Sequence, residues 1–230
     1  EVCRLSVLAQ AQTKLFGQTP LSLKCSRRQV KFFNDKVEIN GKKEIKYEFK
    51  QLDDKIVNKV VAEELRLCWY MMGEGEVNVF EQSIVYFKES VCAICSEISF
   101  DKKADKNKQF SGLIDYLKSH KIPSQDIYYF NYLIRSQRNL YPFLWGNIAW
   151  SQYTPWGWGT TDKITNNPEQ NLEKYTEGRS DFRTDENYVI YFMGYKPDWL
   201  DEKIASVTSA YYIGLGEPAK AARECNRLVN

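Results

Sequence analysis

Apolar residues recur between positions 54 and 72 at the spacing of an α-helix, which is the clearest pattern in the chain. Intervals of three and four residues join Val57, Val61, Leu65, Cys68 and Met72. This period gives a helix one continuous apolar face. Asp53 or Asp54 can cap its N-terminus, and Gly73 ends it. The sequence therefore predicts a long helix at the centre of the core.

The N-terminal residues have a helical period as well. Residues 4–16 carry apolar side chains three and four positions apart, and Gly17 and Pro20 follow them. We expect a short helix or a helical stalk within residues 1–20.

Several shorter segments alternate apolar and polar residues with a period of two, which predicts strands. They are 29–33 and 36–39, followed by the turn sequence Asn40-Gly41, and then 77–80, 83–87, 95–100, 187–193 and 210–214. Helical spacing returns at 110–119, at 126–138 after a cap at Ser124, and around 198–207, and a last strand or short helix holds Cys225. This mixture predicts an α+β fold, with helices packed on a mixed or partly antiparallel sheet.

Length and composition indicate one large folded unit. The chain has 230 residues, of which 43% are apolar, so it can bury a substantial core. We expect residues 21–230 to form a single globular α+β domain. Within it, residues 163–187 are polar and charged without a core-forming period, which predicts a mobile insertion.

The charge of the chain argues against nucleic acid as a partner. Its 32 Lys and Arg residues nearly balance 30 Asp and Glu residues, and the net charge is +2. The basic residues are scattered, whereas a nucleic-acid-binding surface gathers them on one face.

The chain contains an even set of cysteines, which favours disulfide bonds. They are Cys3, Cys25, Cys68, Cys92, Cys95 and Cys225. We expect Cys3 to pair with Cys225, because the two ends of a compact domain often lie close together. A second expected pair is Cys25 with Cys68. The alternative for Cys68 is a reduced thiol on the apolar face of its helix.

The sequence Cys92-Ala93-Ile94-Cys95 has three interpretations. Its spacing resembles the redox site of thioredoxin-like proteins, in which the first thiolate lies at a helix N-terminus. Here the residues after Cys95 alternate like a strand, so a structural role in disulfides near a strand end is favoured. A zinc site would need two further ligands with comparable spacing, and only His120 and isolated cysteines remain.

No other group of residues predicts catalysis. The chain has one histidine and no Gly-x-Ser-x-Gly sequence, which leaves a serine or cysteine triad without support. The adjacent carboxylates Glu63 and Glu64 point to different sides of their helix, and we expect them to be solvated. The sequence thus favours a protein that is not an enzyme, with no cofactor and no metal.

An aromatic-rich loop lies between residues 145 and 161. Its tryptophans alternate with glycine around residues 155–159 and include Trp150, Trp156 and Trp158. Such a loop can fold over one end of the sheet and cover its core, which we favour. It can also offer a stacking platform to a sugar, a peptide or a lipid surface.

No segment of the sequence is apolar over the length that a membrane helix needs. The chain begins Glu1-Val2-Cys3 without a methionine, so we expect a signal or a membrane anchor upstream of residue 1. Removal of such a segment during export would fit an oxidising compartment.

Five segments together resemble a family of uncharacterised archaeal proteins from small-genome lineages. They are residues 62–70, 73–75, 92–96, 155–159 and 210–216. Members of that family resemble single-pass membrane proteins that carry a large outer domain after an N-terminal apolar segment. The resemblance implies a membrane-anchored cell-envelope protein and implies no activity.

These observations lead to one functional expectation and one alternative. We expect an extracytoplasmic, disulfide-containing domain with a structural or binding role at the cell surface. Its expected partners are other envelope components or further copies of itself in a homo-oligomer. The alternative is a thiol-disulfide oxidoreductase that uses Cys92 as nucleophile and Cys95 as resolving thiol.

The loop of residues 145–161 should pack at least two of its four tryptophans against the domain. Replacing Trp156 or Trp158 with alanine should therefore lower the melting temperature, since loss of one buried tryptophan costs about 3 to 5 kcal/mol. Thermal unfolding followed by circular dichroism measures this. Unchanged stability, combined with loss of binding to itself, to glycan or to membrane, would instead identify the loop as a binding surface.

Overall fold

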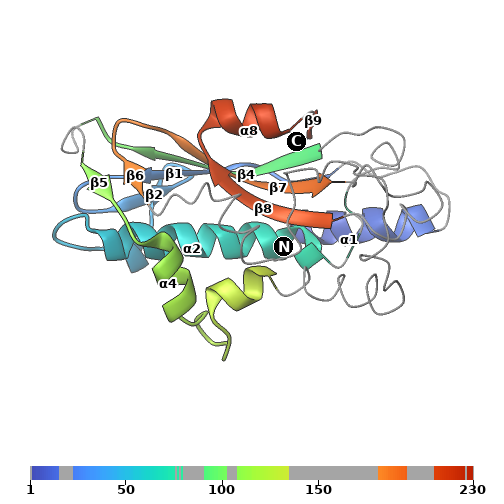
Figure 1. Cartoon of the computed structure of the whole chain (residues 1–230), viewed down its shortest axis with the longest axis horizontal. Coiled ribbons are helices and arrows are strands. Elements are labelled where there is room, and N and C mark those ends of the chain that lie inside the picture. Colours follow the sequence, from blue (N-terminus) through green and yellow to red (C-terminus); the bar gives the residue numbers. More distant parts are fainter. Residues whose placement is uncertain are drawn as a thin grey trace, which may run out of the picture.

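The computed structural model describes residues 2–15, 23–75, 77, 79, 91–102, 108–134, 181–195, 210–225 and 227–229. Within these ranges a mixed sheet carries helices on both of its faces (Figure 1). The predicted α+β fold with a mixed, disulfide-stabilised sheet is confirmed. In the described part of the chain, no helix is both long enough and apolar enough to cross a membrane.

The described chain contains both helices and strands. The helices are α1 (Val2–Leu15), α2 (Asp54–Met71), α4 (Leu113–Ser119) and α8 (Pro218–Glu224), and residues 129–134 are also helical. Short 3-10 helices are η1 (Ile45–Tyr47) and η2 (Gly73–Gly75). The main sheet contains β1 (Arg28–Phe32), β2 (Val37–Ile39), β3 (Lys42–Lys43), β4 (Val91–Phe100), β7 (Tyr188–Tyr195), β8 (Ala210–Gly216) and β9 (Arg227–Val229). A separate two-stranded sheet pairs β5 (Gln109–Phe110) with β6 (Phe182–Arg183).

Strand β4 is the centre of the main sheet. The strand order is β3-β2-β1-β4-β7-β8. One side of β4 pairs with antiparallel β7 along most of its length. The other side is shared by two parallel strands, because β9 pairs with residues 91–93 and β1 with residues 96–100. Segments from both ends of the described chain therefore complete the same strand.

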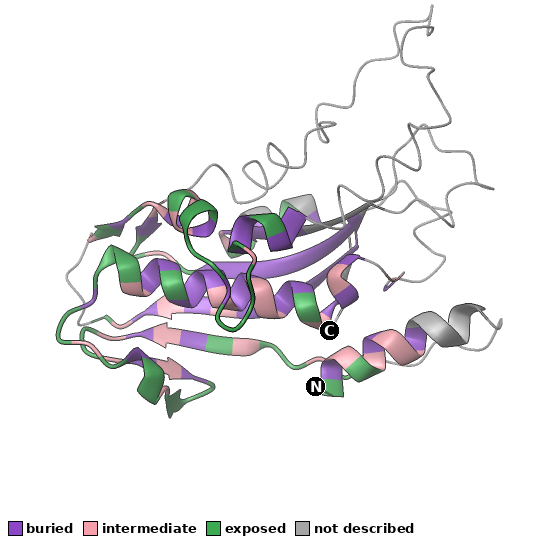
Figure 2. Ribbon diagram, turned by 90° about the horizontal axis from the view of Figure 1, so that it is seen from below, coloured by how far each residue is buried: buried purple, intermediate pink, exposed green. Residues whose placement is uncertain are grey.

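Helix α2 covers one face of this sheet, as predicted from its apolar period (Figure 2). Asp53 caps it by accepting a hydrogen bond from the backbone N–H of Ile56 at 2.8 Å. Its predicted inward positions Val57, Val61, Leu65 and Cys68 are fully buried. Burial of this apolar face against the sheet, rather than helix propensity, stabilises the element.

The opposite face is covered by α8 at one end of the sheet. Val189, Tyr191 and Met193 of β7 are buried there with Cys225, which follows α8. A glycine in the neighbouring strand makes room for the tyrosine ring, since a Cβ atom at Gly214 would lie 2.2 Å from Cζ of Tyr191. An aromatic ring over a strand glycine fills the space that the missing side chain leaves.

An irregularity in β4 turns two consecutive residues toward α2. The register against β7 shifts between Ile94 and Ser96, which is the signature of a β-bulge. As a result, Cys95 bonds to Cys68 of α2, and the next residue, Ser96, donates a hydrogen bond to Glu64 of the same helix at 2.7 Å.

Glu64 is a buried carboxylate, 2% exposed, and it binds three donors. Ser96 Oγ is one of them. The guanidinium of Arg28 in β1 supplies the other two, with Nε donating to Oε2 and Nη2 to Oε1, each at 2.9 Å. Arg28 lies opposite Ser96 in the register of β1 and β4. The expectation that Glu64 is solvated was wrong, because its helix position faces the sheet.

Other differences from the sequence-based expectations are local. Ser124 has a left-handed backbone, φ 66°, instead of capping a helix, and the helical residues begin at 129. Strand β4 starts at Val91, so both residues of the Cys-x-x-Cys sequence lie inside it. The expected elements at 83–87 and 198–207 lie outside the described residues, as do residues 163–180 of the expected insertion.

We expect Arg28→Met to lower the free energy of unfolding by about 3 kcal/mol, because it leaves the carboxylate of Glu64 buried without its cation. Arg27→Met is the matched control. Its ion pair with Glu97 joins side chains that are 38% and 42% exposed, so it should cost less than about 1 kcal/mol. Urea unfolding measures both variants, and equal losses would contradict the role given to Glu64.

Candidate functional site

All six cysteines form disulfides, and the bonds are Cys3–Cys25, Cys68–Cys95 and Cys92–Cys225. The expected pairing of Cys3 with Cys225 was wrong. Cys3 belongs to the core on the α2 side of the sheet, whereas Cys225 lies in the cluster under α8 on the other side. Closeness of the chain ends could not reveal that the sheet separates these two thiols.

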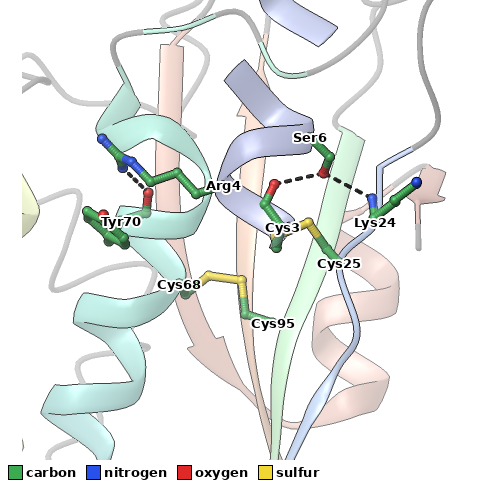
Figure 3. Close-up of a disulfide and its surroundings, with 8 residues drawn as sticks. All are labelled: Cys3, Arg4, Ser6, Lys24, Cys25, Cys68, Tyr70 and Cys95. Carbon is green, nitrogen blue, oxygen red and sulfur yellow. Dashed lines mark hydrogen bonds between the residues drawn. A yellow bond between two sulfur atoms is a disulfide. The ribbon is translucent and has the colours of Figure 1, made fainter. Parts of the chain in front are cut away.

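The expected pair Cys25–Cys68 was also wrong, as was the alternative of a reduced Cys68. Cys68 is buried on the apolar face of α2, as its period indicated, but it bonds to Cys95. Figure 3 shows this bond and the bond Cys3–Cys25 near the N-terminal half of α1.

The two cysteines of the Cys-x-x-Cys sequence lie on opposite faces of β4. Residues three apart in a strand point to opposite sides of the sheet. Cys95 accordingly contacts α2, and Cys92 bonds to Cys225 under α8. Their thiols can neither form a disulfide with one another nor ligate one metal ion.

This geometry does not provide what a thiol-disulfide oxidoreductase requires. The nucleophile of such an enzyme is an exposed thiol at a helix N-terminus. Cys92 is fully buried in the interior of a strand and bonded to a cysteine other than Cys95. Across the described ranges, no three His, Cys, Asp or Glu side chains gather in a group that could hold a metal ion.

The aromatic loop lies outside the described residues. The roles expected for Trp150, Trp156 and Trp158, either covering the core or binding a partner, therefore stay predictions.

A polar cluster that the sequence did not suggest lies on the outer side of α2. This tyrosine–carboxylate cluster consists of Arg4, Glu63, Arg66, Tyr70, Glu74, Tyr129 and Tyr132. It joins α1, the C-terminal half of α2, η2 and the helical residues 129–134.

Glu63 is the acceptor in the first half of the cluster. Arg66, one turn further along α2, donates to both of its oxygens at 2.9 and 3.0 Å. The hydroxyl of Tyr129 donates to Oε2 at 2.9 Å. Because both side chains of the ion pair are mostly buried, these charge-assisted bonds tie residues 129–134 to α2.

Glu74 is the acceptor in the second half. It accepts a hydrogen bond from the hydroxyl of Tyr132 at 2.5 Å and lies 3.5 Å from Nη2 of Arg4. Its backbone is left-handed, φ 59°. The guanidinium of Arg4 also donates to the carbonyl oxygen of Tyr70 and lies 3.9 Å from the centre of the Tyr70 ring (Figure 3).

The surroundings of Glu63, Tyr129 and Tyr132 move their pKa values away from neutral pH. Burial opposes ionisation of Glu63, but the hydrogen bond and charge of Arg66 outweigh it and hold the pKa of that carboxyl below its usual value. Burial, followed by the nearby carboxylates, raises the pKa of both Tyr129 and Tyr132. None of these groups is therefore poised to exchange a proton near pH 7.

Position in the sequence gave no signal for this cluster. Glu63 and Arg66 are neighbours on one helix, but Tyr129 follows its partner Glu63 by 66 positions, and Tyr132 follows its partner Glu74 by 58.

Comparison of the chain with protein-family models, with curated proteins and with solved structures gives no match. The three disulfides indicate an oxidising, extracytoplasmic environment.

The lowered pKa of Glu63 predicts a pH-dependent contribution to stability. Because the folded pKa lies below the ordinary value of 4.5, the contribution is complete above about pH 4.5 and is lost as the pH falls through the folded value. Glu63→Gln should cost about 2 kcal/mol at pH 7, and its difference from the unmodified protein should shrink in acid.

Unfolding in urea at a series of pH values measures this difference. Glu48→Gln is the control, since its partner Lys43 and Glu48 itself are about half exposed. A difference for Glu63→Gln that stays constant down to the acid limit would contradict the ion pair as its source.

Proposed function

We propose that this chain is the extracytoplasmic domain of a membrane-anchored cell-envelope protein, with a structural or binding role and no catalytic activity. The observation that carries the proposal is the complete pairing of the cysteines in three disulfides. Disulfides of this kind form and persist where proteins meet oxidising conditions, outside the reducing cytosol.

The position of the bonds strengthens this argument. Cys68–Cys95 and Cys92–Cys225 lie in the interior, on the two faces of one strand. Bonds in such places cross-link the core itself, so the fold is matched to a compartment in which they stay oxidised. A domain at the cell surface gains resistance to unfolding from them, because each bond restricts the unfolded chain.

A non-catalytic role is supported by the structural contacts that occupy the buried carboxylate of Glu64 and the partly buried carboxylates of Glu63 and Glu74. Glu64 joins a helix to the sheet, and Glu63 and Glu74 join helical segments to one another. A catalytic acid or base needs a pKa near the working pH and access to a substrate. In this protein the pKa of Glu63 is lowered, and the pKa values of Tyr129 and Tyr132 are raised, so all three move further from neutral pH.

The anchor and the partner are proposed on two other observations. The proposed anchor follows from the resemblance carried by residues 62–70, 92–96 and 155–159. Val2 and Leu5 of α1 are 64% and 65% exposed, and exposed apolar side chains favour contact with another protein. The proposed partner is an envelope component or a further copy of the chain.

The proposal predicts that protein isolated without reductant contains no free thiol. Cells are lysed in the presence of an alkylating reagent, and the purified chain is denatured and titrated with a thiol reagent. Peptide mapping should then recover the three bonds of the structure. Six free thiols, one for each cysteine, would overturn the oxidising compartment.

The location is tested on intact cells that produce the full-length protein. Protease added outside should remove the domain while a cytosolic marker survives. Protection of the domain until the membrane is opened would contradict an outer position, and recovery in the soluble fraction would contradict the anchor.

A further inference from the structure

Helix α1 is held to the segment before β1 by one covalent bond and a small number of polar contacts (Figure 3). The bond is Cys3–Cys25. One turn further along, the hydroxyl of Ser6 accepts a hydrogen bond from the backbone N–H of Lys24 at 3.0 Å. The disulfide thus fixes the first turn of the helix, and the hydroxyl fixes the second.

The other contacts of α1 reach the end of α2. Val7 is fully buried and lies beside Gly73. Arg4 contacts Tyr70 and forms a long ion pair with Glu74, in which the side chains are 22% and 28% exposed. Partly exposed ion pairs at such a distance contribute little to stability. The covalent bond is therefore the strongest of the described attachments of α1.

That bond is also the most accessible of the three disulfides. Cys25 is half-buried, and Cys3 is 8% exposed. The cysteines of the other two bonds are 0%, 2%, 0% and 5% exposed, for Cys68, Cys95, Cys92 and Cys225 in turn. Thiol–disulfide exchange requires that an attacking thiolate reach one of the sulfur atoms. Burial therefore protects the two core bonds more than it protects Cys3–Cys25.

We propose that Cys3–Cys25 is a redox-controlled latch that holds α1 on the domain, and that its selective reduction releases α1 while the core bonds stay intact. The proposal goes beyond the structural or binding role above and does not depend on a membrane anchor. It assigns different tasks to the three bonds: two hold the core together, and one holds a helix in place.

Release would change the surface of the domain. Val2 and Leu5 already lie exposed on the outer side of α1, and Val7 lies on its inner side. A detached α1 carries apolar side chains on both sides, because Val7 becomes exposed, and it uncovers the end of α2 at Gly73, beside which Val7 lies. Reduction thus exposes the buried contact between Val7 and Gly73 as apolar surface.

The reductant is a dithiol, either a small molecule or a protein of the dithiol-oxidoreductase class. One of its thiolates attacks a sulfur of the bond, and the other cysteine leaves as a thiolate that takes up a proton. The second thiol of the reductant then resolves the mixed disulfide. Two electrons pass to Cys3 and Cys25, which end as thiols, and the dithiol becomes a disulfide.

The first test is the order of reduction in the native protein. The full chain is treated with limiting dithiothreitol, quenched with an alkylating reagent, and analysed by peptide mass spectrometry. Cys3 and Cys25 should be alkylated at least about tenfold faster than the other four cysteines. Prior or simultaneous reduction of either core bond would overturn the proposal.

The second test is a matched pair of variants studied by hydrogen exchange. The double variant Cys3→Ser and Cys25→Ser removes the latch, and amides of α1 should exchange about tenfold faster or more while amides of β4 keep their protection. Ser6→Ala keeps the disulfide and should leave α1 protected. Unchanged exchange in α1 of the double variant, or loss of protection throughout the domain, would each overturn the latch.

Discussion

The attachment of α2 to β4 is the constraint on which the rest of the described fold depends. Two residues one helical turn apart, Glu64 and Cys68, meet two consecutive strand residues, Ser96 and Cys95. In a regular strand, neighbouring side chains point to opposite faces of the sheet. The bulge in β4 is therefore what allows both Cys95 and Ser96 to contact α2. The helix is thereby fixed on the strand that also binds β1, β7 and β9.

The disulfides restrict the unfolded chain to different extents. Their cysteines are 22, 27 and 133 residues apart. In the chain-entropy model the two short loops contribute about 3.5 kcal/mol each, and the long loop closed by Cys92–Cys225 contributes about 5 kcal/mol. The bond that spans most of the chain thus supplies the largest restriction, while the bond inside the α2 interface sets the packing of helix on sheet.

Local patterns in the sequence predicted most of the described elements but did not predict the contacts between them. The period of α2, a cap at Asp53 or Asp54 and a strand at 187–193 follow from residues close together in the sequence. The structure contains α2 with its cap at Asp53, and β7 at Tyr188–Tyr195. The disulfide partners of Cys92 and Cys95 depend on which face of a strand each residue occupies and on what covers that face. Glu64 was misjudged for the same reason, because adjacency on a helix does not tell which side meets the sheet. Glu63 lies on the outer side of α2, where Tyr129, 66 positions later in the chain, donates a hydrogen bond to it.

The arrangement of β9 has a consequence for biogenesis. Among the described residues, residues 91–93 of the central strand have residues 227–229 as their second neighbour. Synthesis must therefore reach residue 229 before this side of β4 can be paired, and until then its backbone groups can pair with other strands. Loss of residues 227–229 would leave the backbone groups of residues 91–93 open to strands of other molecules, so we expect it to promote aggregation during folding.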